Sequence, residues 1–168
     1  LGDVYKRQGT ENIAGAAAMA AALEYACRNM QKNSAKLLAL RNRLIEGLLK
    51  IPHSRLNGAF EGRLPNNVNI SFEGTEGESL LLLLDAKGIC ASSGSACTTA
   101  SLEPSHVLLA LGLPHEIAHG SLRLTLSEEN TEEDIEYIIN AVAEVVETVR
   151  GISSFWDDLQ SGKIKHFI

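Results

Sequence analysis

Two short segments of the chain alternate polar and apolar residues, and this alternation constrains the fold more than any other feature. Residues 67–72 read Asn-Val-Asn-Ile-Ser-Phe, and residues 120–126 carry a leucine at every second position. Side chains repeat every two residues along a β-strand, so both segments predict strands with one buried face and one exposed face. In the second segment the exposed set is Ser121, Arg123 and Thr125, and the buried set is Leu122, Leu124 and Leu126.

Other stretches repeat their apolar residues at helical spacing. Residues 9–29 are rich in alanine and have Thr10 as a candidate N-cap, and residues 31–49 carry leucines three and four positions apart. These two stretches predict two helices, or one long bent helix. Further helices are predicted over residues 76–85, 105–111 and 131–150.

Local signals support the boundaries of these later helices. The run Leu80–Leu84 fits a buried helix better than a strand, and Gly88 is expected to end it in a left-handed conformation. Ser105 can cap the short helix that follows. Asn130 or Thr131 can cap the last helix, whose first turn is acidic, as the helix dipole favours.

The order of these elements predicts an α+β fold. With further strand candidates at residues 55–57 and 89–92, we expect a three- or four-stranded, mostly antiparallel sheet with helices on one face. The tail, residues 153–168, is expected to be loosely docked or disordered. Leu1–Gln8 resembles a translated sequencing adapter, so we exclude it from fold reasoning and expect the natural chain to begin upstream.

Composition excludes several classes of function. The chain has 45% hydrophobic and 21% charged residues, as globular proteins do, and a net charge of −6 without a dominant basic patch. Nucleic acid and anionic membranes are therefore poor candidates as partners. No apolar run approaches the roughly 20 residues that span a bilayer.

The three cysteines do not have the spacing of a secreted disulfide framework. An odd number of cysteines fits a reducing compartment, so we expect a cytoplasmic protein. Cys27 is expected on the inner face of its helix and Cys90 in the core.

Cys97 differs from the other two because it lies in the run Ser92-Ser93-Gly94-Ser95-Ala96-Cys97. These small and polar residues provide no apolar anchor, so the run predicts a cysteine on a flexible arm. A thiolate there would be a strong nucleophile. The alternative is a solvent loop in which the cysteine has no role, and loop composition alone does not decide between the two.

Arg123 is the second candidate, because its strand points it away from the three leucines. Its guanidinium could clamp a carboxylate through two parallel hydrogen bonds. An ordinary surface arginine paired with an acidic neighbour explains the same pattern. Thr10 begins a helix, where free N–H groups and a hydroxyl can bind phosphate, although an ordinary cap has the same sequence.

The histidines do not form a recognisable metal motif. His106, His115, His119 and Cys97 could suggest zinc, but the chain has neither a Cys-x-x-Cys nor a His-Glu-x-x-His pattern. We predict no metal site. His119, just before Gly120, is expected to be a hydrogen-bonding structural residue or, alternatively, a proton carrier.

Taken in order, these pieces resemble the C-terminal part of a NifS/IscS-type cysteine desulfurase of the long-loop group. The resemblance runs from Gly9-Thr10-Glu11-Asn12 through the serine-rich run at Cys97 and the Ser-His-Val-Leu segment to His119-Gly120-Ser121-Leu122-Arg123. It implies the aminotransferase-like fold of class V pyridoxal phosphate enzymes, with residues 9–31 at the end of the large cofactor domain. Residues 32–152 would be the small C-terminal domain and 153–168 its tail.

The resemblance also implies an activity and the residues that carry it. Such an enzyme is a homodimer that uses pyridoxal 5′-phosphate to convert L-cysteine to L-alanine, and passes the sulfur as a persulfide to a scaffold protein for iron–sulfur cluster assembly. By this resemblance Cys97 is the nucleophile, which could also ligate a cluster transiently. Arg123 holds the substrate carboxylate, and Thr10 reaches the cofactor phosphate of the neighbouring subunit.

The family's cofactor lysine is expected upstream of this chain, which would leave these 168 residues inactive alone. The alternative is a stand-alone persulfide carrier or scaffold-docking module without catalysis, which needs no such lysine.

Overall fold

The computed structural model describes residues 9–93 and 104–168, and the chain divides into two compact units, Leu1–Ser34 and Ala35–Ile168. One helix, α1 (Ile13–Leu48), runs through the boundary between them. The alternative of a single long helix is therefore confirmed over that of two. Cys97 lies outside the described residues.

The start of α1 differs from the prediction. The side-chain oxygen Oδ1 of Asn12 accepts a hydrogen bond from the backbone N–H of Gly15 at 2.9 Å, three residues on. That is the bond of an N-cap residue, so Asn12 and not Thr10 caps the helix. Cys27, predicted to face inward, is exposed. Within residues 9–34, the described part of the first unit, this helix is the one regular element, so these residues offer it no other element to bury a side chain against.

A three-stranded antiparallel sheet forms the centre of the second unit. Its strands are β1 (Ser54–Leu56), β2 (Asn67–Phe72) and β3 (Ser121–Thr125), in that spatial order. Phe72 lies opposite Ser54, and Asn69 lies opposite Arg123. The α+β prediction is thus confirmed with three strands. Residues 89–92, predicted as a strand, contribute a single bridge between Ser92 and Arg123.

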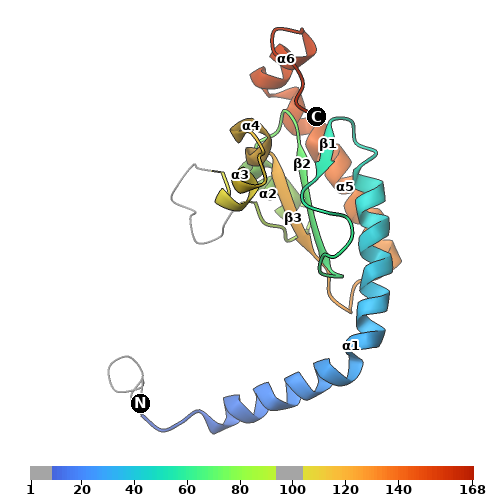
Figure 1. Cartoon of the computed structure of the whole chain (residues 1–168), viewed down its shortest axis with the longest axis vertical. Helices are drawn as coiled ribbons and strands as arrows, with labels where there is room; N and C mark the ends of the chain where they lie inside the picture. Colours follow the sequence, from blue (N-terminus) through green and yellow to red (C-terminus); the bar gives the residue numbers. More distant parts are fainter. Residues whose placement is uncertain (1–8, 94–103) are drawn as a thin grey trace. The chain divides into compact units, whose positions relative to one another are not determined.

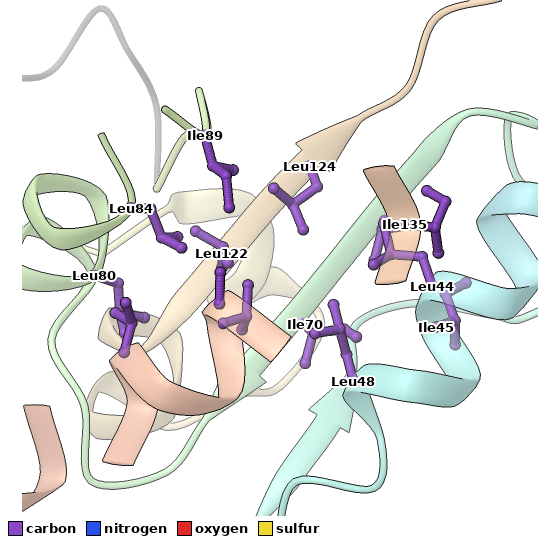
Figure 2. Packing of buried hydrophobic residues seen from close by; sticks show 14 of the residues in the cluster. Leu44, Ile45, Leu48, Ile70, Leu80, Leu84, Ile89, Leu122, Leu124 and Ile135 are labelled. Carbon is purple, nitrogen blue, oxygen red and sulfur yellow. The ribbon is translucent and has the colours of Figure 1, made fainter. Parts of the chain in front are cut away.

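The helices that build the core cover one face of this sheet (Figure 1). They are α2 (Gly77–Asp85), α5 (Glu132–Gly151) and the part of α1 that belongs to the second unit. Figure 2 shows how their apolar side chains gather against β2 and β3. The fully buried members include Leu44, Ile45, Leu48, Val68, Phe72, Leu80, Leu84, Ile135 and Val142.

The predicted helix signals mostly hold in the second unit. The hydroxyl of Thr131 accepts a bond from the backbone N–H of Asp134, whose carboxylate in turn accepts one from the N–H of Thr131. This reciprocal capping box begins α5 at Glu132. Gly88 has a φ of 76°, the left-handed conformation expected after α2.

Two predictions for buried faces were wrong in detail. Cys90 is exposed, because its neighbour Ile89 takes the core position. Ser121 is buried, although it alternates with the leucines of β3. Ser121 is the first residue of β3, where the strand alternation no longer determines what covers a side chain.

Two short helices follow the undescribed residues 94–103. The first, α3 (His106–Ala110), is shorter than predicted, and Ser105 precedes it without a side-chain cap bond. The second, α4 (His115–His119), was not predicted. Five residues give little more than one turn, too few for a periodic signal. The two helices share a small apolar cluster, formed by Leu108, Leu113, Ile117 and Ala118.

The tail is docked, contrary to the prediction of a loose or disordered segment. It forms α6 (Ser154–Gln160), capped by the hydroxyl of Ser153, which accepts a bond from the N–H of Trp156 at 3.2 Å. Leu159 of this helix is only 2% exposed. None of the helices in the described ranges is long and apolar enough to cross a membrane.

Candidate functional site

Arg123 occupies the middle of β3, between two neighbouring segments. Its backbone exchanges two hydrogen bonds with Ser92, of 2.7 and 3.0 Å. Because these bonds point toward Ser92, the pair that Arg123 makes with Asn69 on the other side is of the non-hydrogen-bonded type, in which side chains lie close together. The side chain of Arg123 is exposed, and its neighbours Leu122 and Leu124 are buried. The predicted orientation of Arg123 is confirmed.

Ser92 and Ser93 form the base of the serine-rich run, and the structure fixes both. Ser92 is held by its two bonds to Arg123. Ser93 lies against α2: a Cβ built on Gly77 would come within 2.7 Å of the Cβ of Ser93 and within 2.9 Å of the carbonyl oxygen of His119. The run that contains Cys97 therefore leaves the sheet directly beside Arg123. Cys97 itself lies outside the described residues.

Thr10, the third predicted residue, is exposed before the start of α1. Its hydroxyl is compatible with a phosphate contact, but the helix start around it is largely satisfied by the chain itself. The N–H of Ile13 donates to the carbonyl of Glu11, and the N–H of Gly15 donates to Asn12. One hydroxyl does not make a cofactor site, so we derive no step of chemistry through a cofactor from these residues.

The histidines considered for zinc do not come together as a group in the part of the chain that the structure describes. His106 and His115 are exposed, and His119 is half-buried near Glu76. Burial acts to raise the pKa of Glu76. Hydrogen bonds from the N–H groups of Glu78 and Ser79 outweigh this effect, and electrostatic attraction between the carboxylate and His119 acts in the same direction as these bonds. The pKa of Glu76 is therefore lowered.

A different polar cluster, which the sequence did not indicate, lies where β2 ends. Glu73 is fully buried, and the imidazoles of His53 and His166 lie beside its carboxylate. Arg150 of α5 donates to the backbone carbonyls of Glu73 and His53, at 2.9 and 3.1 Å. We call these four residues the Glu73 cluster. Its bonds join residues that lie 77 to 97 positions apart in the sequence, which is why no local pattern marks them.

The Glu73 carboxylate is shared between two consecutive residues of the tail. The N–H of Phe167 lies 2.6 Å from Oε1, and Nδ1 of His166 lies 2.7 Å from Oε2. The next residue is also held, because its carbonyl oxygen lies 3.0 Å from Nδ1 of His53. These contacts satisfy a buried carboxylate, which would otherwise carry a large desolvation cost.

Ring geometry in the Glu73 cluster favours hydrogen bonding over metal binding. The ligand atoms of His53, Glu73 and His166 lie within 4.8 Å of one another, a set that zinc could use. However, the two imidazoles stack with centroids 3.9 Å apart and planes inclined by 19°, so their nitrogen lone pairs lie in two separate, nearly parallel planes and not in planes that meet at one ion. A carbonyl and a carboxylate both require Nδ1 to carry a proton as donor, which leaves no lone pair there for a metal.

Arg150, the fourth member of the Glu73 cluster, is buried and lies against an aromatic ring. Burial lowers the pKa of Arg150, and the nearby charge of Glu73 opposes that shift. The guanidinium lies over the ring of Trp156 at 4.1 Å, a cation–π contact. Beside it, a hollow of about 630 Å³ is lined by the end of α1, by α5 from Ile139 to Gly151, and by Trp156. Arg123 is not part of that lining.

Comparison with known proteins places these features in a family. The model of the aminotransferase class-V family matches residues 3–138. The chain belongs to this family. It is 56% identical over 148 residues to the cysteine desulfurase IscS of Methanosarcina thermophila, which covers 88% of this chain and 37% of that protein. It is 45% identical over 152 residues to the cysteine desulfurase NifS of Azotobacter vinelandii, covering 90% and 38%.

Solved structures agree with the family assignment. A NifS-like protein from Rickettsia africae superposes with a TM-score of 0.74 at 33% identity, covering 88% of this chain and 39% of that one. Another NifS-like protein gives a TM-score of 0.73 at 30% identity, with 84% and 36% covered. The chain thus spans about two fifths of the length of the relatives that it matches. The activity of the whole protein is therefore a proposal.

Proposed function

We propose that this chain is part of a cysteine desulfurase that uses pyridoxal 5′-phosphate. The longer protein would convert L-cysteine to L-alanine and carry the released sulfur on Cys97 as a persulfide. The names of the relatives support this reaction class, since several are cysteine desulfurases that share half or more of the matched residues. Cys97 and Arg123 are the residues to which we assign the chemistry.

The observation that carries the proposal is the pairing of Ser92 with Arg123. The chain enters the serine-rich run from a residue whose backbone is bonded twice to that of Arg123. Arg123, whose guanidinium can hold a carboxylate, therefore lies beside the residue from which the serine-rich run starts. Cys97, which bears the thiol, follows five residues beyond Ser92 in the sequence. Such proximity is what a transfer from a bound amino acid to a protein thiol needs.

In this proposal the Arg123 guanidinium binds the carboxylate of L-cysteine through two parallel hydrogen bonds. The Cys97 thiolate attacks the substrate sulfur, and an S–S bond forms as the substrate's C–S bond breaks. The electron pair of the broken bond stays on carbon, which takes up a proton to give L-alanine, and Cys97 is left as the persulfide. Pyridoxal phosphate, when bound, supplies the electron sink for this bond cleavage.

The remaining parts of the proposal follow from the family resemblance. We propose a homodimer, with Thr10 reaching the cofactor phosphate of the neighbouring subunit, and a cytoplasmic location. The sulfur would pass from Cys97 to a scaffold protein for iron–sulfur cluster assembly. Inactivity of the 168 residues alone stays a prediction.

The test is to replace Cys97 by alanine in the full-length protein. We expect sulfide and alanine production from L-cysteine to be abolished, and alkylation followed by mass spectrometry to find the persulfide on Cys97 of the parent. Cys90→Ala is the matched control, because Cys90 is an exposed cysteine seven residues earlier in the sequence. Unchanged sulfide production by the Cys97 variant would overturn the assignment. Persulfide uptake by Cys97 without any alanine production would favour the stand-alone carrier.

A further inference from the structure

The C-terminal segment, residues 161–168, links two parts of the second unit, the Glu73 cluster and the small apolar cluster of α3 and α4. At one end of the connection, His166 and Phe167 bind the carboxylate of Glu73. At the other, the side chain of Ile168 packs against the small apolar cluster of α3 and α4. These two helices are the first described elements after the run that contains Cys97.

The bonds to the Glu73 cluster fix both the position and the direction of the segment. Three consecutive residues, 166 to 168, each make one specific polar contact, and the two carboxylate oxygens take the first two. The receiving loop is itself held: the carbonyl of His53 accepts from the N–H of Glu73 at 3.0 Å and from Arg150 at 3.1 Å. His53 adopts a φ of 54°, a conformation that a non-glycine residue keeps only where its surroundings enforce it.

The cluster of α3 and α4 is small enough to need such support. It has four buried apolar residues, and its partly buried members are Leu109 and Ile168. Short helices with few buried contacts belong to the least stable parts of a fold. An additional apolar side chain, delivered at a fixed place by a segment that is bonded elsewhere, raises the cost of opening these helices.

We infer that Glu73 is a positioning residue: by binding His166 and Phe167 it holds Ile168 against α3 and α4, and so sets how firmly these helices stay folded after the Cys97 run. The stability part of this inference stands alone. Its consequence for sulfur transfer rests on the proposed function.

The experiment is hydrogen exchange with mass spectrometry on the full-length protein. Glu73→Gln keeps one oxygen for the N–H of Phe167 but replaces the acceptor of His166 by an NH₂ group. We expect exchange in residues 161–168 to rise about tenfold or more, since a hydrogen bond to a charged group is lost, and exchange in residues 106–119 to rise with it. The matched control is Glu61→Gln, an exposed glutamate, which leaves both regions unchanged.

A second pair of variants guards against misfolding of the Glu73 variant. Phe167→Pro removes the N–H that binds Glu73 and should loosen α3 and α4, whereas Phe167→Ala keeps that N–H and removes only a half-exposed ring. Combining Glu73→Gln with Phe167→Pro should add little, because both break the same connection. Faster exchange in the C-terminal segment with unchanged exchange in residues 106–119 would overturn the inference.

Two further readouts separate the inference from its alternatives. Adding a metal chelator should change nothing; a loss of protection in residues 161–168 would show that a metal holds the segment. In the same variants kcat for sulfur release should fall while KM for L-cysteine stays constant, because the substrate contact at Arg123 is not touched. If Cys97→Ala retains activity while exchange behaves as expected, the proposed function fails and the positioning role of Glu73 stands.

Discussion

Two polar regions, one beside the middle of β2 and one just past its end, behave in opposite ways. Asn69, within β2, faces the exposed Arg123, whereas Glu73, four residues on, is fully buried among charged and aromatic groups. At Arg123 the backbone is held by two bonds to Ser92, and the side chain is exposed. At Glu73 both carboxylate oxygens are already used by the chain. The first arrangement suits the reversible binding of a ligand, and the second suits holding a segment of the protein in place.

The sharpest test of this contrast is at Arg123. In the full-length protein, Arg123→Ala should lower kcat/KM for L-cysteine by about 100-fold or more, because a bidentate, charge-assisted contact is lost. Arg123→Lys should fall in between, since it keeps the charge but not the fork. Stability should hardly change. Steady-state kinetics and thermal unfolding measure the two effects.

The control for this prediction is Arg55→Ala. Arg55 is also exposed, and it pairs with Ser71 in the same sheet. Equal losses of kcat/KM in both variants would mean that any positive charge on this sheet contributes, and Arg123 would lose its assignment to the substrate carboxylate.

The second prediction concerns Gly74, beside Glu73. Gly74 has a φ of 80°, and a Cβ on it would overlap the ring of Trp156. Gly74→Ala should therefore destabilise the protein by about 2–4 kcal/mol, from the strained backbone and the displaced ring together. Chemical denaturation measures the loss, and the fluorescence of Trp156, the only tryptophan in the chain, reports the displacement.

Gly62→Ala separates the two causes. Gly62 has a similar φ of 72°, but no atom lies within 4 Å of its Cβ position. Gly62→Ala should lower the free energy of unfolding by about 1 kcal/mol and leave the fluorescence of Trp156 unchanged. If the two variants cost the same, α6 does not press on Gly74, and the region around Glu73 is less rigid than its contacts indicate.

The contrast also explains how far the sequence could predict this structure. Strands β2 and β3 and helix α5 follow from periodic patterns of apolar residues, and the outward direction of Arg123 follows from the same alternation. The Glu73 cluster does not, because its bonds join His53, Glu73 and His166 across long stretches of chain, and each residue is unremarkable in its local sequence.

The docking of the tail could have been predicted from the sequence. Ser153 is a good N-cap, and Phe155, Trp156 and Leu159 have the spacing of a helix with an apolar face. The polar residues around them led to the expectation of a loose tail. Roles for Cys97 and Thr10, in contrast, came from the family resemblance and remain predictions, since neither a loop thiol nor a helix cap specifies its own chemistry.

The smallest predicted effect concerns Glu76, the residue before α2 and three residues after Glu73. Its carboxylate caps α2 by accepting bonds from the N–H groups of Glu78 and Ser79, at 2.8 and 2.9 Å. The pKa of Glu76 lies below its ordinary value of 4.5, because these bonds outweigh the opposing effect of burial. A carboxyl group with a lowered pKa in the folded state stabilises the protein above its unfolded pKa, and this contribution is lost as the pH falls through the folded pKa.

Glu76→Gln should therefore cost about 0.5–1 kcal/mol at neutral pH, a modest value because the side chain is largely exposed and screened. The difference from the parent should shrink as the pH falls below 4.5 and vanish once Glu76 is protonated in both states. Urea unfolding at a series of pH values measures this convergence. A difference that stays constant with pH would mean that the charge of Glu76 is irrelevant and that only its shape caps α2. In that case, the start of α2, where Gly77 supports Ser93, would not respond to acid.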